Sequence, residues 1–246
     1  MSTIDKRNPL PYYEQLAELL RREIGAKQAA GELYQLPSEN ELAEQHGISR
    51  ATVRHALDEL EQEGWIYRQK GVGSFAPVRR IEQDLTALVS TSEEMSLRGW
   101  PLVTKVLSVD QAPAAAHVAR ALELPPETPI YAVCRLRVVD DAPLSVQTNF
   151  LPAALCPKLE EADLTSSLYR LLESRYGLRL WTGREILRAR GATLHEAQLL
   201  DIREGTPVMY AERTTYAVSG IPVEYLEAVW RGDRYDFTVT LTRPMG

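Results

Sequence analysis

A short run of residues beginning at Ser49 gathers side chains that can bind nucleic acid. Arg50, Thr52 and Arg54 follow within this run. An arginine can donate two parallel hydrogen bonds to a guanine edge, and serine or threonine hydroxyls can bind phosphate oxygens. Apolar residues at helical spacing from Val53 onward place these donors in the first turn and a half of a helix. The pattern indicates DNA recognition, with a solvated helix of mixed charge as the alternative.

A pair of arginines forms the second chemical pattern. Arg135 and Arg137 are two residues apart in a segment with β-strand alternation, so both side chains project from one face of a sheet. Two guanidinium groups on one face imply an anion or acidic side chains as partners. A solvated strand surface is the alternative, because arginine is mostly exposed in proteins.

Catalytic and metal-binding motifs are not recognisable in the sequence. The histidines are His46, His55, His117 and His195. No Ser-His-Asp order, metal-ligand spacing or Walker sequence accompanies them. Gly71, Gly73 and Ala76 match a dinucleotide fingerprint, but a proline follows where that motif requires a helix. We therefore expect no catalytic residue, metal or cofactor, and an enzyme is the less favoured alternative.

Residues 9–77 have the pattern of a small DNA-binding domain. Apolar residues from Tyr13 to Ile24 repeat at helical spacing and predict a first helix. Ser38 and Glu41 have the spacing of a capping box and predict the start of a second helix. Only a short glycine-containing turn separates this helix from the one that begins near Arg50, as in a helix-turn-helix.

A two-stranded wing is predicted after the third helix. The run from Trp65 to Gln69 and the return at Ser74 and Phe75 are aromatic or β-branched in part, and the turn between them contains two glycines. Lys70 stands at this turn, where it can reach into a minor groove.

These features resemble the winged helix-turn-helix of the GntR family of bacterial transcription regulators, over the stretch LPSENELAEQHGISRATVRHALDELEQEGWIYRQKGVGSF. The resemblance implies DNA contacts from Ser38, Asn40, Ser49, Arg50, Thr52, Arg54, Lys70 and Gly71. Asn40 stands where arginine is usual in the family, so it lacks that phosphate-binding charge. Ser38 and Ser49 would cap helices even without DNA. Arg54 and Lys70 have no such structural reason to be present.

The remaining chain is predicted to be a connector, residues 78–84, and a second domain, residues 85–246. Residues 105–139 and 183–217 look like an internal repeat, since Leu122 matches Leu200 and Arg135 matches Arg213 at a constant offset. Each copy predicts a strand, a short helix and a strand hairpin. Two copies could share one antiparallel sheet with flanking helices, which makes the whole chain α+β.

Three segments of this domain resemble the effector-binding UTRA domain of the HutC branch of GntR regulators, which has a chorismate-lyase-like fold. The segments are ARALELPPETPIYAVCRLRVVDDAPLSVQTNFLP, SSLYRLLESRYGL and IPVEYLEAVWRGDRYDF. The resemblance implies anion contacts from Ser90, Ser92, Arg135, Arg137 and Ser167, with Gln147, Glu224 and Trp230 lining the rest of the pocket. Gln147 replaces a frequent glutamate and Trp230 a common tyrosine, so a sugar phosphate, a phosphonate or a carboxylate all stay open as the effector.

Bulk properties agree with a two-domain globular protein. The chain has 246 residues, 44% hydrophobic and 25% charged, with a net charge of -6 that does not exclude a local DNA-binding patch. Cys134 and Cys156 lack a metal or redox spacing and are expected as reduced thiols. The sequence has no signal-peptide pattern or membrane span, so we expect a soluble cytoplasmic protein.

Together the two resemblances predict a ligand-responsive transcription regulator, and we expect a repressor. It would bind a two-fold operator DNA as a homodimer, make no membrane contact, and leave the operator when a small anionic effector binds. A DNA-binding protein without an effector is the main alternative.

Overall fold

The computed structural model describes residues 4, 5, 7–29, 34–69, 71–76 and 80–243. The chain divides into two compact units, residues 1–79 and 80–246. Each has its own hydrophobic core. Residues 81–84, which the sequence assigns to the connector, instead form a strand of the second unit, because their backbone pairs with the strand at residues 235–238.

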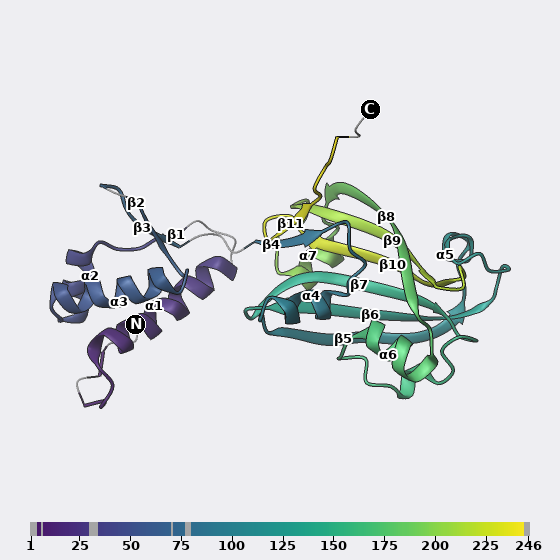
Figure 1. Ribbon diagram of the computed structural model, residues 1–246, viewed down its shortest axis with the longest axis horizontal. Coiled ribbons are helices and arrows are strands. Elements are labelled where there is room, and N and C mark those ends of the chain that lie inside the picture. Colours follow the sequence, from purple (N-terminus) through teal and green to yellow (C-terminus); the bar gives the residue numbers. More distant parts are fainter. Residues whose placement is uncertain (1–3, 6, 30–33, 70, 77–79, 244–246) are drawn as a thin grey trace. The chain divides into compact units, whose positions relative to one another are not determined.

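The N-terminal unit is a winged helix-turn-helix, as predicted (Figure 1). Its helices are α1 (Tyr12–Ala29), α2 (Glu39–His46) and α3 (Arg50–Gln62). Its strands, β1 (Tyr34–Gln35), β2 (Tyr67–Gln69) and β3 (Gly73–Ala76), pair in the order β1-β3-β2. The apolar faces of the helices meet in one cluster that includes Leu16, Leu20, Ile24, Val53, Leu57 and Leu60.

Local signals fix where α2 and α3 begin. The Ser38 hydroxyl accepts from the Glu41 amide while the Glu41 carboxylate accepts from the Ser38 amide, which completes the predicted capping box. Gly47 ends α2 with φ of 63°, a left-handed conformation that glycine adopts without a steric penalty. The Ser49 hydroxyl accepts from the Thr52 amide and starts α3.

The second unit is built on a six-stranded antiparallel sheet in the order β5-β6-β7-β10-β9-β8. Its strands are β5 (Leu102–Pro113), β6 (Pro129–Val139), β7 (Ala142–Pro152), β8 (Leu180–Gly191), β9 (Pro207–Ala217) and β10 (Pro222–Arg231). The strand order reads the same in each half, β5-β6-β7 and β8-β9-β10. With α5 (Ala116–Ala121) and α7 (Leu194–Leu200) between the first and second strands of each half, the sheet confirms the predicted repeat.

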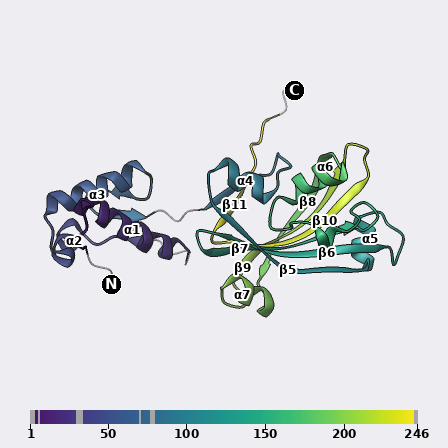
Figure 2. The ribbon, with the colours of Figure 1, turned by 90° about the horizontal axis from the view of Figure 1, so that it is seen from below.

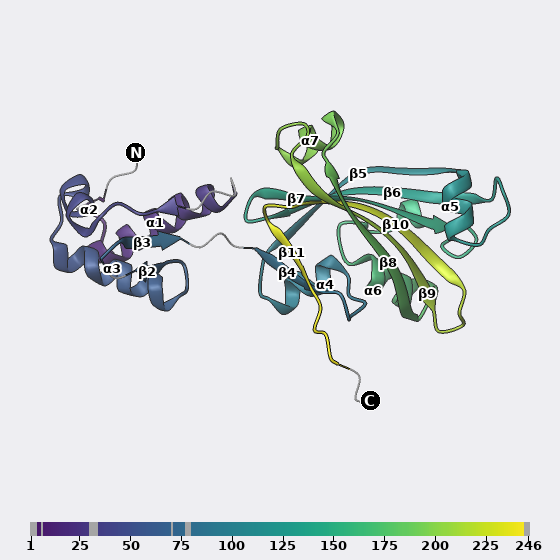
Figure 3. The same cartoon turned by 90° about the horizontal axis from the view of Figure 1, so that it is seen from above.

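Helices cover both faces of this sheet, and α7 lies on the side opposite α4 and α6 (Figures 2 and 3). The alternation of β6 explains the division, because Tyr131 and Val133 pack with α6 (Leu168–Tyr176) whereas Leu136 and Val138 pack with α7. Short helix α4 (Thr91–Leu97), the 3-10 turn η1 (Leu159–Glu161) and a parallel pair, β4 (Ile81–Asp84) with β11 (Tyr235–Thr238), complete the unit. In the described part of the chain, no helix combines the length and hydropathy needed to cross a membrane.

Removing the N-cap hydroxyl of α2 should destabilise the N-terminal unit. Ser38→Ala deletes the acceptor of the Glu41 amide at an exposed position, so we expect the free energy of unfolding to fall by about 1 kcal/mol. Urea unfolding followed by circular dichroism measures the loss. Glu44→Ala, on the same helix and also exposed, is the control, and equal losses in both variants would contradict the capping role.

Candidate DNA-binding surface and effector site

The start of α3 presents its polar side chains to solvent. Ser49, Arg50 and Arg54 are exposed, and Thr52 is half-buried. The hydroxyls of Ser49 and Thr52 lie 2.8 Å apart and bond each other, so both are oriented before any DNA arrives. Hydroxyls and guanidinium groups on the first turns of a helix are suited to phosphate and base contacts.

The other predicted DNA contacts lie on neighbouring elements of the same unit. Ser38 and Asn40 are exposed at the first turn of α2, and Gly71 occupies the wing turn with φ of 79°. Lys70, the predicted cation of the wing, lies outside the described residues. Roles in DNA binding for all these residues stay predictions.

Sequence reasoning missed a side chain that braces the wing against α3. Arg68 of β2 pairs with Asp58 at 2.7 Å and with Glu61 at 3.5 Å, and it donates to the Arg54 carbonyl at 3.5 Å. The available signal was the spacing of the two acids, which places them on one side of the helix. Asp58 and Glu61, in the second half of α3, therefore anchor the wing.

In the second unit, Arg135 and Arg137 are buried on the sheet face that α4 and α6 cover, with 1% and 2% of their surface exposed. The alternative of a solvated strand surface is therefore wrong. Arg135 donates from Nη2 to Asn149 Oδ1 at 2.8 Å, while its Nε and Nη1 have no hydrogen-bond partner among the described residues. Burial lowers the pKa of Arg135 to about 10, which reflects the cost of its desolvated charge.

Arg137 lies in a ring of neutral acceptors. It donates to Thr104 Oγ1 at 2.6 Å, to Gln147 Oε1 at 3.1 Å and to Ser92 Oγ at 3.4 Å. Burial, together with the neighbouring charge of Arg135, holds the pKa of Arg137 well below its ordinary value. The structure thus brings Ser92, Gln147 and the arginine pair together, as the sequence predicts.

Glu224 contributes a buried carboxylate to the same hydrogen-bond network. It is fully buried and accepts hydrogen bonds from Asn149 at 2.5 Å, Thr215 at 2.8 Å and Tyr169 at 3.2 Å. Asn149 connects it to Arg135. These three partners were missed from the sequence, although Asn149 lies two residues from Gln147 on β7 and so shares its face.

Ser90 and Ser167 meet where two helices begin. Ser90 caps α4 and Ser167 caps α6, both are buried, and their hydroxyl oxygens lie 3.3 Å apart. A cavity of about 370 Å³ adjoins them, lined by Ser92, Glu93, Ser96, Ser166, Ser167, Arg170, Leu171 and Ser174. Serine hydroxyls at converging helix starts are compatible with an anion.

Trp230 differs from the other predicted effector-binding residues because it lies in an apolar cluster. Its ring stacks at a tilt on Tyr235, with the ring centres 4.3 Å apart, and contacts Phe237 edge-on at 6.2 Å. It belongs to the apolar cluster that contains Ile81 and Met95. This placement follows from β11, which folds back to pair with β4.

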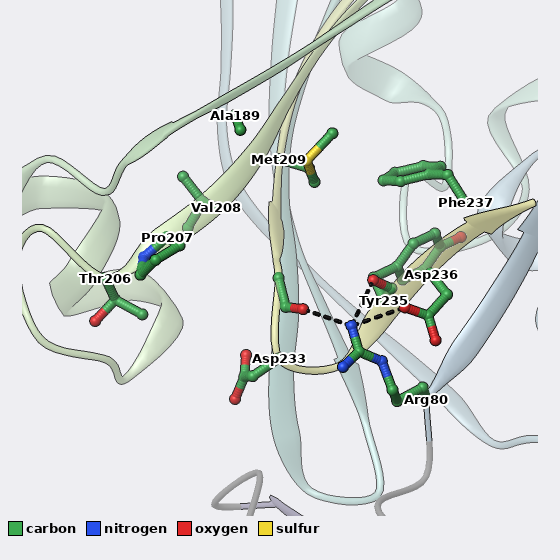
Figure 4. Close-up of a pocket in the computed structure, with 11 residues that line it drawn as sticks. Arg80, Ala189, Thr206, Pro207, Val208, Met209, Asp233, Tyr235, Asp236 and Phe237 are labelled. Carbon is green, nitrogen blue, oxygen red and sulfur yellow. Dashed lines mark hydrogen bonds and ion pairs between the residues drawn. The ribbon is translucent and has the colours of Figure 1, made fainter.

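A separate cavity of about 620 Å³ opens beside β11 and has mainly apolar walls, which include Val208, Met209 and Phe237 (Figure 4). Arg80 closes one side, where it donates to the Gly232 carbonyl at 2.8 Å and pairs with Asp236 at 2.7 Å. This cavity contains none of the predicted effector residues. Across the described residues, no cluster of histidine, cysteine and acidic side chains could hold a metal ion.

Helix α4 is tied to β4 and β11 by a buried carboxyl group. The Tyr235 hydroxyl lies 2.8 Å from Glu94 Oε2 and 3.1 Å from Gln83 Oε1. Burial raises the pKa of Glu94, although Tyr235 and Arg98 oppose that shift. The helix that carries Ser90 and Ser92 is therefore linked to the strand by which the chain enters the domain.

The winged helix-turn-helix of the N-terminal unit places the chain in the class of DNA-binding transcription regulators. The chain belongs to the GntR family of bacterial regulatory proteins, whose model matches residues 12–76, and residues 98–236 match the UTRA domain.

Similar proteins agree with this assignment. The chain is 35% identical to the HTH-type transcriptional repressor NagR of Bacillus subtilis, over 98% of each protein. It is 28% identical to the mannosyl-D-glycerate transport/metabolism system repressor MngR of Escherichia coli, over 95% of this chain and 97% of that one. The crystal structure of PhnF from Mycobacterium smegmatis superposes with a TM-score of 0.67 at 26% identity, over 91% of this chain and 99% of PhnF.

Replacing Glu94 by glutamine should change how stability depends on pH. Because the pKa of Glu94 is raised on folding, the folded chain binds this proton more tightly than the unfolded chain does. Its contribution favours folding below the ordinary glutamate pKa of about 4.3 and is lost as pH rises through the folded-state pKa. Glu94→Gln should therefore gain stability relative to the native chain as pH rises.

Melting temperatures measured from about pH 4 to about pH 8 follow this difference. Glu161→Gln, which removes an exposed carboxylate, is the control and should show no such trend. If the melting temperatures of the native chain and Glu94→Gln differ by the same amount at every pH, the raised pKa of Glu94 does not contribute to the pH dependence of stability.

Proposed function

We propose that the chain is a ligand-controlled repressor that binds a two-fold operator as a homodimer and is released by a small anionic metabolite. The observation that supports this proposal most directly is the buried guanidinium of Arg135, whose Nε and Nη1 have no hydrogen-bond partner within the described residues. A buried charge with unused donors carries a desolvation cost that an anion would offset. A DNA-binding protein without an effector would have no use for such a group.

The names of relatives support repression and a metabolite effector. NagR and MngR are both named as repressors, and MngR is named for mannosyl-D-glycerate transport and metabolism. For this chain we propose an anion with a polar body, in the class of sugar phosphates, phosphonates and carboxylates. Arg135, Arg137, Ser92 and the Ser90–Ser167 pair would bind the anionic group, while Gln147 and Glu224 would contact the polar body.

An enzymatic role has less support. Among the histidines, His117 contacts Glu227 at 3.1 Å and stacks edge-on with Phe150 and Tyr225, in the cluster around α5. That cluster is on the sheet face opposite the arginine pair, so His117 cannot serve as a base there. We therefore propose a sensor rather than a catalyst, in a protein of the cytoplasm.

The contacts of α4 suggest how effector binding would change the affinity for the operator. An anion bound to Arg137 would compete with Ser92 for the hydrogen bond that the guanidinium donates. Gln147 also donates a hydrogen bond to Thr91 of α4 at 3.0 Å. A shift of α4 would reach β4 through Glu94, Tyr235 and Gln83. The effector changes operator affinity only if it binds the two arrangements of α4 with different affinity.

Anionic probes should stabilise the native chain through the arginine pair. A panel of sugar phosphates, phosphonates and urocanate is screened by thermal unfolding, where a compound at a hundred times its Kd adds about 2.7 kcal/mol to the free energy of unfolding. Arg135→Met and Arg137→Met should each abolish this shift without loss of operator binding, since removal of a buried charge need not destabilise the fold.

Arg188→Met is the matched control, because it removes an arginine that is 52% exposed and pairs with Glu212 on the same sheet. It should retain the full thermal shift. A shift that survives in both buried variants would contradict the proposed anion site.

Arg54→Ala should reduce operator binding more than binding to random DNA. We expect a loss of about 10- to 100-fold that is confined to some base substitutions in the operator. Fluorescence anisotropy with labelled duplexes measures both affinities. Arg22→Ala, an exposed arginine of α1, is the control, and equal losses on operator and random DNA in Arg54→Ala would instead indicate a phosphate contact.

A further inference from the structure

Arg54 of α3 is held by a carboxylate from the neighbouring helix α2. Its Nε donates to Glu39 Oε1 at 3.2 Å and its Nη2 donates to Glu39 Oε2 at 2.9 Å. This two-pronged pairing has a strong directional preference. A long side chain that is 57% exposed is therefore oriented by the protein itself.

Glu39 is itself well placed to orient another side chain. It is the first residue of α2, directly after the N-cap Ser38, and the capping box with Glu41 fixes where that helix begins. The Glu39 side chain is only 27% exposed. The pair therefore connects the rigid start of one helix to the surface of the next.

The pairing leaves one edge of the Arg54 guanidinium available. Of its five N–H donors, Glu39 uses the one on Nε and one of the two on Nη2. No acceptor in the described part of the chain takes a hydrogen bond from Nη1. The donors along the Nη1–Nη2 edge are parallel, which is the arrangement that N7 and O6 of guanine accept in the major groove.

The charge of the pair favours a base over a phosphate as the partner of Arg54. The Glu39 carboxylate offsets the charge that would attract a phosphate, and it is itself repelled by the DNA backbone. Hydrogen bonds to a neutral base edge need no net charge. The Arg54 guanidinium holds the pKa of Glu39 below its ordinary range, so the carboxylate stays ionised at neutral pH.

We propose that Glu39 is a specificity-determining residue, which positions the free edge of Arg54 against a guanine in the major groove of each half-site. Glu39 acts only through Arg54 and makes no base contact of its own. This proposal rests on the proposed function, since it requires that α3 enters the groove.

The test measures how well variants of the full-length chain discriminate between bases. The probe is a duplex selected by the native chain from random sequences, together with duplexes in which each guanine pair of a half-site is replaced in turn. Discrimination at a position is the dissociation constant of the duplex substituted there divided by that of the selected duplex. Arg54→Ala identifies the guanine concerned, where discrimination should fall about 10-fold or more.

Two substitutions of Glu39 separate geometry from charge. Glu39→Gln should lower discrimination about 10-fold at the same guanine and leave other positions unchanged, while random DNA binds more tightly because one negative charge is gone. Glu39→Asp keeps the charge but is one methylene too short to reach Arg54 in this geometry. It should lose the same discrimination without tighter binding to random DNA.

A matched control and a double variant complete the design. Glu44→Gln removes an exposed charge from the same helix and should tighten binding to random DNA without changing discrimination. In an Arg54→Ala background, Glu39→Gln should change discrimination no further. A further loss in that background, or native discrimination in both single Glu39 variants, would overturn the positioning role.

Failure of the proposed function gives a different result. If Arg54→Ala weakens all duplexes equally, the assignment of Arg54 as a base contact is wrong, and the role of Glu39 falls with it. If Arg54→Ala loses discrimination but the Glu39 variants do not, only the inference about Glu39 is overturned. Melting temperatures of all variants, compared with the native chain, confirm that each comparison is between folded proteins.

Discussion

The burial of two like charges on one sheet face is the constraint on which the second domain depends. Arg135 and Arg137 lose nearly all contact with water, and hydrogen bonds or an anion must replace that hydration. The groups that bond them directly, including Gln147, Asn149 and Thr104, are neutral. Neutral acceptors satisfy some donors without cancelling the charge, which is why we propose an anion as the ligand of this domain.

The internal repeat shows how one strand position can serve two purposes. Arg213 on β9 is the repeat equivalent of Arg135 on β6, and it is also buried. Burial alone would lower the pKa of Arg213, but Tyr169, Glu224 and Glu185 outweigh it and raise the pKa above its ordinary value. The charges around Arg213 therefore outweigh its desolvation, whereas at Arg135 desolvation prevails and lowers the pKa.

Local signals in the sequence predicted the parts of the structure that depend on short spacing. The Ser38–Glu41 capping box, the start of α3 and the two hairpins of the sheet all follow from residues close together in the chain. Strand alternation also placed Arg135 and Arg137 on one face. It could not tell that the face carrying them is covered, because the covering helices α4 and α6 come from other segments. The positions of Trp230 and of residues 81–84 depend similarly on β11, which lies far along the chain from β4.

Charged groups have different physical roles in the two domains. Ion pairs of the N-terminal unit, such as Arg54 with Glu39 and Arg68 with Asp58, are partly exposed, and exposed pairs contribute little free energy. Their value lies in orientation, since each fixes a long side chain at the surface that we propose as the DNA interface. In the second domain, Arg135 and Arg137 are buried, and Nε and Nη1 of Arg135 have no hydrogen-bond partner among the described residues. Their burial costs free energy, and the anion that we propose as effector would offset part of that cost. In the function that we propose, a surface that recognises a DNA sequence benefits from oriented side chains, whereas a sensor whose ligand shifts an equilibrium requires differential binding energy.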